Sequence, residues 1–199
     1  MSAVSESIAR EYFEMLGYLV CQPRKYTVPG RQKKAFEEVD LVVLNTSVLE
    51  QKLPEALVWS TEDLAGVARA VVAVRGWHTE RFYASTFEQT PDILRFVETE
   101  SLQYAAQILG TDDMAKVLCL PRLPAGGELK EQSIAFLKEK GIDGIISFRT
   151  MLGELVLRVE TQKNYEKSDL LQIIRLMKNY DLLREPQLEL FGKKRRRRT

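Results

Sequence analysis

The alternation of hydrophobic and polar residues along the chain predicts its strands. In residues 36–44 (FEEVDLVVL), Val39, Leu41 and Val43 recur at every second position, so they share one face of an extended segment and the acidic residues share the other. Residues 70–76 (AVVAVRG) are apolar on both faces until the run ends, which is typical of a central strand. Further strands are predicted at residues 18–21, 116–120 and 142–149, and residues 154–160 are expected to pair with the last of these as a hairpin.

Apolar residues at helical spacing predict helices at residues 5–17, 90–109, 128–140 and 168–183, with a short one starting at Thr61. Pro91 suits a first helical position, and Gly110 suits the residue after a helix end. The inner face of the last helix is predicted to consist of Leu170, Ile173, Ile174, Met177 and Tyr180.

Strands that alternate with helices indicate an α/β fold, with a mixed β-sheet flanked by helices on both faces. No linker or change of composition interrupts residues 1–185. The sequence therefore predicts a single domain over residues 1–185, followed by a disordered basic tail over residues 186–199.

Composition is typical of a soluble globular protein, since 45% of the 199 residues are hydrophobic and 29% are charged. The formal net charge of +1 is unevenly distributed: the run from Lys193 to Arg198 carries six positive charges, and subtracting them leaves −5. No apolar run reaches the roughly 18 residues of a membrane span, and the N-terminus lacks the apolar centre of a signal peptide. We therefore expect a cytoplasmic protein with no membrane partner.

Several kinds of catalytic site are excluded by residue counts. One histidine provides neither a zinc cluster nor a Ser-His-Asp set, and Gly126-Gly127 lacks the Lys-Ser/Thr of a phosphate-binding loop. Cys21 and Cys119 lie in apolar runs, and we expect both to be buried thiols in a reducing compartment.

Three motifs occur in the order of a known nuclease family. Glu6 precedes Leu16-Gly17-Tyr18 on the first predicted helix, the strand Glu37-Glu38-Val39-Asp40-Leu41-Val42 follows, and the strand Val71-Val72-Ala73-Val74-Arg75 comes next. Over residues 5–120 the chain resembles the PD-(D/E)xK, or restriction endonuclease-like, nuclease superfamily, in particular archaeal Holliday-junction-resolvase-like proteins. The resemblance implies a restriction endonuclease-like core, here with a C-terminal α/β extension.

The resemblance also implies a metal site that is incomplete. Such nucleases use acids and a lysine at one end of the sheet to bind Mg²⁺, which activates a water for phosphodiester hydrolysis. By this resemblance the candidate catalytic residues are Glu6, Asp40 and Arg75, and the candidate metal ligands are Asp40 and Glu38. Ala73 occupies the place of the second acid, and Arg75, which stays protonated, occupies the place of the lysine.

No cofactor is therefore expected in a degenerate, inactive site. Magnesium enters only in the alternative in which Glu62, Asp63 or Glu80 has replaced the missing acid. Asp40 also has an ordinary explanation as an ion-pair partner at a strand end. Arg75-Gly76-Trp77-His78 is either a phosphate grip with a base-stacking aromatic residue or a strand end capped by Trp77.

Clustered cations indicate contact with nucleic acid, DNA more than RNA, because flexible positive charges neutralise phosphates without reading sequence. The candidates lie in the loop after the first predicted strand and in the tail: Arg31, Lys33, Lys34, Lys193, Lys194, Arg195, Arg196, Arg197 and Arg198. The function predicted is nucleic-acid binding with catalysis lost. The alternatives are an active Mg²⁺-dependent endonuclease with a rearranged site and a non-catalytic structural or interaction subunit, and a homodimer or a protein partner stays open.

Overall fold

The computed structural model describes residues 3–24, 34–78 and 81–183. The chain divides into two compact units, with the boundary between Arg158 and Val159. The single domain over residues 1–185 stays a prediction. The tail over residues 186–199 lies outside the described residues.

A five-stranded mixed sheet with the strand order β1-β2-β3-β4-β5 forms the centre of the first unit. Its strands are β1 (Leu19–Cys21), β2 (Leu41–Leu44), β3 (Arg69–Val74), β4 (Ala115–Leu120) and β5 (Gly144–Ser147). The first three strands pair antiparallel, and β3, β4 and β5 pair parallel. The parallel strands therefore end together at one side of the sheet, here called the carboxyl edge, and begin together at the opposite amino edge.

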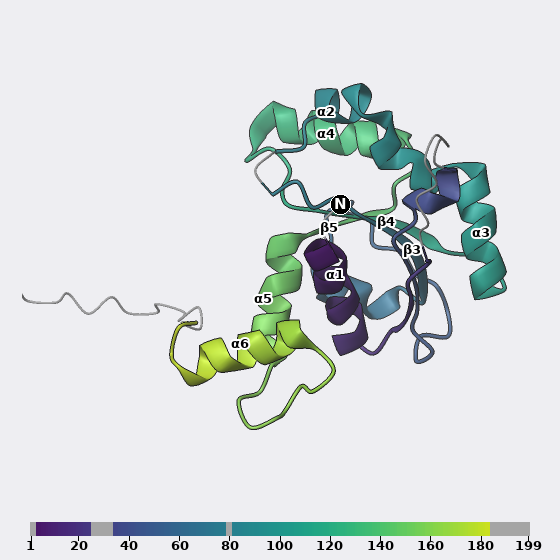
Figure 1. Ribbon diagram of the computed structural model, residues 1–199. Coiled ribbons are helices and arrows are strands. Elements are labelled where there is room, and N and C mark those ends of the chain that lie inside the picture. The colour runs from purple at the N-terminus through teal and green to yellow at the C-terminus, as the bar shows by residue number, and fades with distance from the viewer. Residues whose placement is uncertain (1–2, 25–33, 79–80, 184–199) are drawn as a thin grey trace, which may run out of the picture. The chain divides into compact units, whose positions relative to one another are not determined.

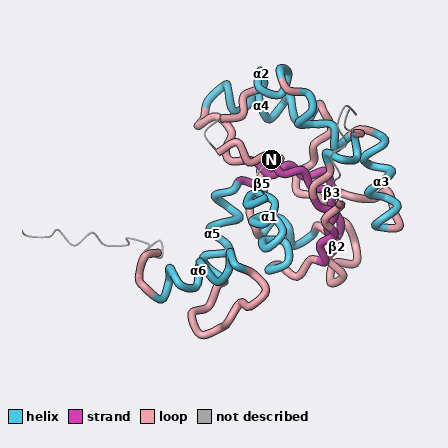
Figure 2. Tube along the Cα trace, viewed as in Figure 1, coloured by secondary structure: helices cyan, strands magenta, loops and turns pink. Residues whose placement is uncertain are grey.

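Helices cover both faces of this sheet, so the predicted α/β class is confirmed (Figure 1). The α-helices of the first unit are α1 (Ala3–Met15), α2 (Ala84–Gln89), α3 (Thr99–Leu109), α4 (Gly127–Glu139) and α5 (Phe148–Arg158). Short 3-10 helices are η1 (Ala35–Glu38), η2 (Glu62–Gly66) and η3 (Pro91–Val97). Helices α1 and α5 pack together on one face, and α2, α3 and α4 lie over the other (Figures 1 and 2).

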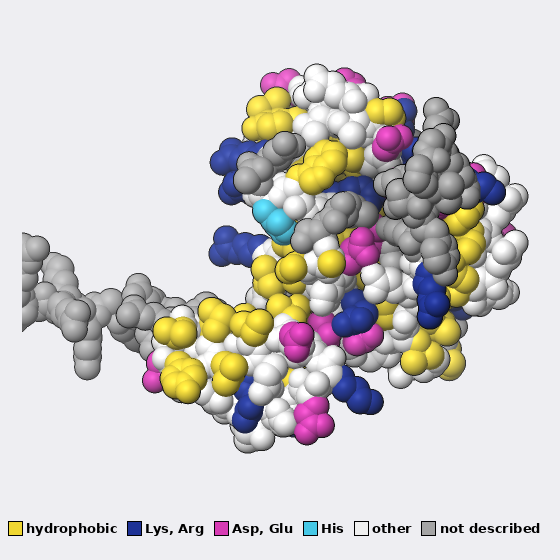
Figure 3. Space-filling model, viewed as in Figure 1, with side chains coloured by type: hydrophobic (Ala, Val, Ile, Leu, Met, Phe, Trp, Pro, Cys, Tyr) yellow, Lys and Arg dark blue, Asp and Glu magenta, His cyan; other side chains and the backbone are white. Residues whose placement is uncertain are grey.

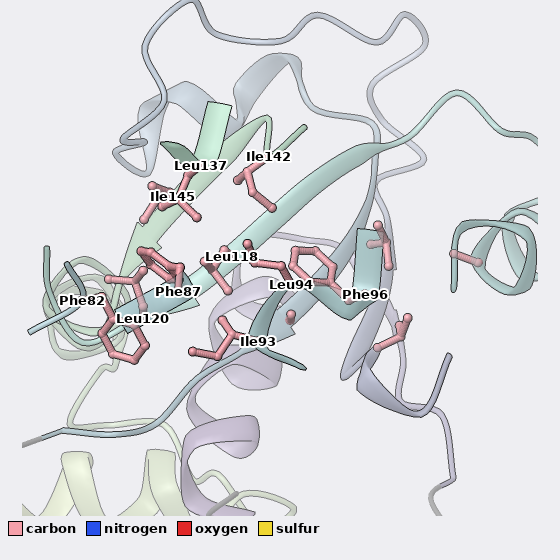
Figure 4. Close-up of a cluster of buried hydrophobic side chains, with 14 of the residues drawn as sticks. Phe82, Phe87, Ile93, Leu94, Phe96, Leu118, Leu120, Leu137, Ile142 and Ile145 are labelled. Atoms are coloured by element: carbon pink, nitrogen blue, oxygen red, sulfur yellow. The ribbon is translucent and has the colours of Figure 1, made fainter. Parts of the chain in front are cut away.

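A hydrophobic cluster of the described residues fills the space between the sheet and the second helix layer. Phe82 and Phe87 from α2 and the segment before it pack with Leu118 of β4 and Leu137 of α4 (Figure 4). All four side chains are at most 1% exposed. Burial of each contributes roughly 1.5–3 kcal/mol, so this cluster fixes α2 and α4 against the sheet.

Two strand predictions are wrong. Residues 154–158 of the predicted hairpin partner belong instead to α5, because Phe148, Met151 and Leu155 recur at helical spacing and are all buried. The predicted strand at residues 36–44 starts only at Leu41, because residues 35–38 form η1, in which the Glu37 carboxylate accepts the Lys34 N–H at 2.9 Å.

The long helix predicted at residues 90–109 is divided into η3 and α3. Glu98 separates them in an extended conformation, with φ −66° and ψ 154°, and the Ser101 hydroxyl donates to the Arg95 carbonyl at 2.8 Å across the break. The predicted end at Gly110 is confirmed, since this residue has a φ of +74° that favours glycine. The sequence pattern missed α2, which is only six residues long.

The second unit contains α6 (Asp169–Asn179), whose first turn is capped by the Ser168 hydroxyl accepting the Leu171 N–H at 3.2 Å. Leu171 and Ile174 are buried, whereas Ile173 is 54% and Tyr180 is 72% exposed, so the predicted inner face is wrong at Ile173 and Tyr180. Lys178 Nζ donates to the Val159 carbonyl at 2.9 Å and closes the loop that precedes the helix. No helix among the described residues of either unit is long and apolar enough to cross a membrane.

Candidate functional site

Asp40 and Arg75 meet at the carboxyl edge of the sheet, as the sequence predicts. Asp40 directly precedes β2, and the antiparallel pairing of β2 with β3 places it beside the end of β3. Its N–H donates to the Val72 carbonyl at 3.0 Å, and its Oδ2 accepts from the Val74 N–H at 2.6 Å and from Arg75 Nη1 at 2.8 Å. The carboxylate therefore caps the end of β3 and neutralises the arginine that follows it.

The guanidinium of Arg75 is enclosed by groups of this protein. Its Nη1 also donates to the Val74 carbonyl at 3.1 Å, and its Nη2 donates to the Ile93 carbonyl at 3.0 Å. The Nη2 atom lies 3.5 Å from Glu38 Oε2. Only 3% of the Arg75 side chain and none of the Asp40 side chain is exposed. A guanidinium held in this way is a buried ion-pair partner and does not present its donors to a phosphate outside.

These residues do not fit a magnesium site. Both candidate ligands, Asp40 and Glu38, face the permanent positive charge of Arg75, which occupies the position that a cation would take. Ala73 is fully buried in the hydrophobic cluster and has no ligating atom. Among the described residues no group of three or more His, Cys, Asp and Glu side chains is suited to hold a metal ion.

Two of the three acids proposed to replace Ala73, Glu62 and Asp63, lie at the opposite edge of the sheet. Glu62 and Asp63 belong to η2, which precedes β3 at the amino edge. Asp40 lies level with Ala73, so it is roughly 13 Å along the strand from Arg69 at the start of β3, at about 3.3 Å per residue. Glu80 lies outside the described residues.

Glu6 lies in the first turn of α1, which approaches the end of β3. The Glu6 carboxylate accepts a hydrogen bond from Gln22 Nε2 at 2.8 Å. Its neighbour Ser5 packs against Gly76, where a Cβ would lie 2.1 Å from the Ser5 hydroxyl oxygen. Glycine is therefore required at position 76 for α1 to approach this closely.

Exposed cationic side chains follow each parallel strand at the carboxyl edge. Arg81, Arg122 and Arg149 lie in the segments after β3, β4 and β5, and all three are exposed. The Phe82 N–H donates to the Arg122 carbonyl at 3.2 Å, which joins the first two segments. The exposed His78 ring lies 4.7 Å from the ring of Phe148, the residue before Arg149, which joins the first to the third. We call His78, Arg81, Arg122 and Arg149 the carboxyl-edge cluster.

No arginine of this cluster forms an ion pair with an acid among the described residues, whereas arginines elsewhere in the first unit do. Arg69, for example, donates to Asp113 at 2.6 Å. Side chains of Lys and Arg and the single histidine appear together on the face shown in Figure 3. The segment after β3 also contains the acidic Glu80, outside the described residues.

Acidic residues gather at the opposite edge of the same strands. The segments that lead into β3, β4 and β5 contain Glu62, Asp63, Asp112, Asp113 and Asp143. Two of these acids are partly neutralised by strand residues, Asp113 by Arg69 and Asp143 by Lys116. Apart from the exposed Lys140 before β5, the described charges that precede the parallel strands are mainly acidic and those that follow them are mainly arginines. Such an uneven distribution of charge orients an approaching anion.

The only tryptophan that is not fully buried belongs to the carboxyl edge. Trp77 is half-buried, and its ring stacks on Phe82 with 5.7 Å between centroids and 16° between planes. The next residue, His78, forms a hydrogen bond with the Ser5 hydroxyl at 3.2 Å. Trp59, by comparison, is 1% exposed and donates its indole N–H to the Ala56 carbonyl at 2.8 Å.

The two thiols differ from each other. Burial raises the pKa of the Cys119 thiol, and the nearby negative charge of Asp40 raises it further, so this sulfur is a poor nucleophile. Cys21 is exposed, so the prediction that both thiols are buried is wrong. Cys21 belongs to a three-residue edge strand, and edge positions bury fewer side chains than central ones.

Of the cationic residues that the sequence predicts to bind nucleic acid, only Lys34 belongs to the described residues. Lys34 is exposed, and its Nζ lies 5.8 Å from the ring centroid of Phe36. Arg31 and Lys33, and the tail residues from Lys193 to Arg198, lie outside the described residues. Arg81, Arg122 and Arg149 were not among the predicted binding residues. Each lies within a few residues of a predicted strand end, but only the parallel pairing of β3, β4 and β5 shows that these ends share an edge.

No family model, no curated protein and no solved structure matches this chain.

Proposed function

We propose that this protein binds the phosphate backbone of nucleic acid at the carboxyl-edge cluster and does not cleave it. The observation that carries the proposal is the uneven distribution of charge across the sheet: three arginines without acidic partners among the described residues follow the parallel strands, and five acids precede them. In open α/β sheets, ligands bind outside the carboxyl ends of the strands. Arginine suits phosphate because its planar donors bind two oxygens at once.

Nucleic acid is favoured over a small phosphate compound because the cations are spread over three separate segments. A polymer of phosphates contacts dispersed cations together, and each contact adds to affinity without reading sequence. The basic residues of the loop and tail, including Lys34 and the run from Lys193 to Arg198, add further positive charge on the same chain. DNA is the ligand proposed first.

We also propose that the first unit is a restriction endonuclease-like core that has lost its metal site. The succession of α1, β2 after Asp40, β3 before Arg75, α3 and β4 supports this, because it follows the order that the motifs imply. Helix α4, β5 and the helices after it form the C-terminal extension. Arg75 bound between Asp40 and Glu38 supports a structural role for residues that would otherwise bind metal.

Binding by a charge variant tests this proposal. Arg81, Arg122 and Arg149 are all changed to Gln. A matched control changes Lys52, Lys138 and Lys140 to Gln, because these lysines are also exposed and their replacement removes the same charge. Three lost phosphate contacts, at about 0.7 to 0.9 logarithmic units each, reduce affinity by about 100- to 500-fold near 0.1 M salt. Fluorescence anisotropy with labelled DNA measures this loss, and the control variant should bind within a few-fold of the wild type.

Other outcomes identify the alternatives. Equal affinity of the wild type and the cluster variant for DNA would refute binding at the carboxyl-edge cluster. Cleavage of DNA with Mg²⁺ or Mn²⁺ that disappears in Asp40→Ala would establish the nuclease alternative. Absence of binding and cleavage, together with a stable oligomer in solution, would favour an interaction subunit.

A further inference from the structure

Trp77 combines an accessible position with a fixed orientation. Its backbone follows Gly76, which is held against Ser5 of α1, and the preceding Arg75 N–H donates to the Cys119 carbonyl at 2.8 Å. Phe82 supports the indole by parallel stacking at 5.7 Å. The indole N–H has no hydrogen-bond partner among the described residues. The ring also packs against the hydrophobic cluster but is not fully buried, so its orientation is fixed while part of it remains accessible to a ligand.

The single histidine and two arginines lie near Trp77, along the chain or through Phe82. His78 follows it directly, Arg81 lies four residues later, and Arg122 is joined to the adjacent Phe82 by a backbone hydrogen bond of 3.2 Å. Figure 3 shows Lys and Arg side chains and hydrophobic side chains on the face that contains the single histidine. An aromatic ring among cations is the arrangement by which proteins stack single-stranded bases and bind their phosphates.

We propose that the carboxyl edge binds single-stranded nucleic acid, with an unpaired base stacked on Trp77 and the flanking phosphates on the arginines of the carboxyl-edge cluster. This inference rests on the proposed function and names its substrate class. A base within a duplex has both faces covered by its neighbours, so it cannot stack on a side chain. Selection of single strands therefore comes from the indole, and the phosphate contacts alone do not provide it.

Two substitutions separate stacking from simple packing. Trp77→Leu keeps an apolar contact with Phe82 and removes the aromatic ring, whereas Trp77→Phe retains a smaller ring. Loss of one stacked base lowers affinity by about 5- to 150-fold. We expect Trp77→Leu to lose this much affinity for oligothymidine, Trp77→Phe to lose less, and neither to change affinity for a duplex of the same length. Circular dichroism and thermal melting verify that each variant is folded.

Intrinsic fluorescence gives a second measurement that needs no disruptive variant. The chain has two tryptophans, and Trp59 lies in the core with 1% of its surface exposed. Saturating oligothymidine should quench the emission of the wild type, and Trp77→Phe, which retains only Trp59, should show no quenching. Unchanged emission of the wild type at saturation would overturn the inference even if Trp77→Leu failed to fold.

The outcomes distinguish this inference from the proposal on which it depends. If single strands and duplexes bind equally well, and Trp77→Leu affects neither while the arginine variant weakens both, phosphate binding stands and single-strand selection is refuted. If neither nucleic acid binds to the wild type, both proposals fail. Tighter binding of single strands, lost selectively in Trp77→Leu, supports both.

Discussion

Replacing Arg75 with Met should destabilise the protein strongly, because it leaves the Asp40 carboxylate buried without its counter-charge. Methionine retains most of the length and apolar volume of the arginine side chain but none of its donors. Asp40 would keep the Val74 N–H at 2.6 Å, but the 2.8 Å contact with Nη1 would be lost. The Ile93 carbonyl would also lose the donor that now lies at 3.0 Å.

The expected loss is large compared with the stability of an ordinary domain. Removing one partner of a buried ion pair costs about 3–5 kcal/mol. Domains of this size are typically stable by about 5–15 kcal/mol, so a substantial part of the folding free energy is at risk. The double variant Asp40→Leu/Arg75→Met removes both charges, and we expect it to recover at least half of the loss.

Urea unfolding at neutral pH, followed by circular dichroism, measures these differences. Arg95→Met is the matched control, because Arg95 also contacts an acid, Glu98 at 3.5 Å, but its side chain is 27% exposed. A pair of this kind contributes about 0–1 kcal/mol. If Arg75→Met costs no more than Arg95→Met, or if the double variant is as unstable as the single one, Arg75 is not the enclosed counter-charge described above.

Three further predictions concern the core and the thiols. In native protein one thiol, Cys21, should react with a chromogenic disulfide reagent and Cys119 only after unfolding; rapid reaction of both would contradict the burial of Cys119. Gly144→Ala should cost about 1–3 kcal/mol, because the new Cβ would lie 2.4 Å from the Trp59 ring, and an unchanged melting temperature would contradict this contact. Burial raises the pKa of Tyr18 to about 12. The contribution of Tyr18 to the free energy of unfolding is therefore fully present below pH 10 and is lost as the pH rises toward 12, because the unfolded chain loses this proton first. Tyr18→Phe should lose less stability between pH 10 and pH 12 than the wild type. Identical curves of unfolding free energy against pH for the two proteins would refute this contribution of Tyr18.

Periodicity predicted most of the fold where a segment had one consistent pattern. The central strand and its parallel neighbour were readable because uninterrupted apolar runs are buried on both faces. Residues 148–158 were misread because Leu155, Leu157 and Val159 alternate as in a strand, although Phe148, Met151 and Leu155 form the buried helical face. Leu157 is 70% exposed, so its hydrophobicity carried no information about the core.

The candidate site was only partly readable for a different reason. The meeting of Asp40 with Arg75 followed from two adjacent strands and was predicted. The enclosure of Arg75 was not, because the carbonyl of Ile93 comes from a 3-10 helix that local periodicity does not identify. The carboxyl-edge cluster depends on which ends of the strands share an edge, and that is known only once β3, β4 and β5 are seen to run parallel.

The dependence of affinity on salt concentration tests the central claim most directly, because it counts phosphate contacts at the carboxyl edge. The logarithm of the DNA association constant is measured against the logarithm of salt concentration for the wild type, for the variant with Gln at positions 81, 122 and 149, and for the lysine control. We predict that the slope of the cluster variant is smaller in magnitude by about 2 to 3, while the control keeps the slope of the wild type. Parallel lines for the wild type and the cluster variant would contradict phosphate binding by these arginines.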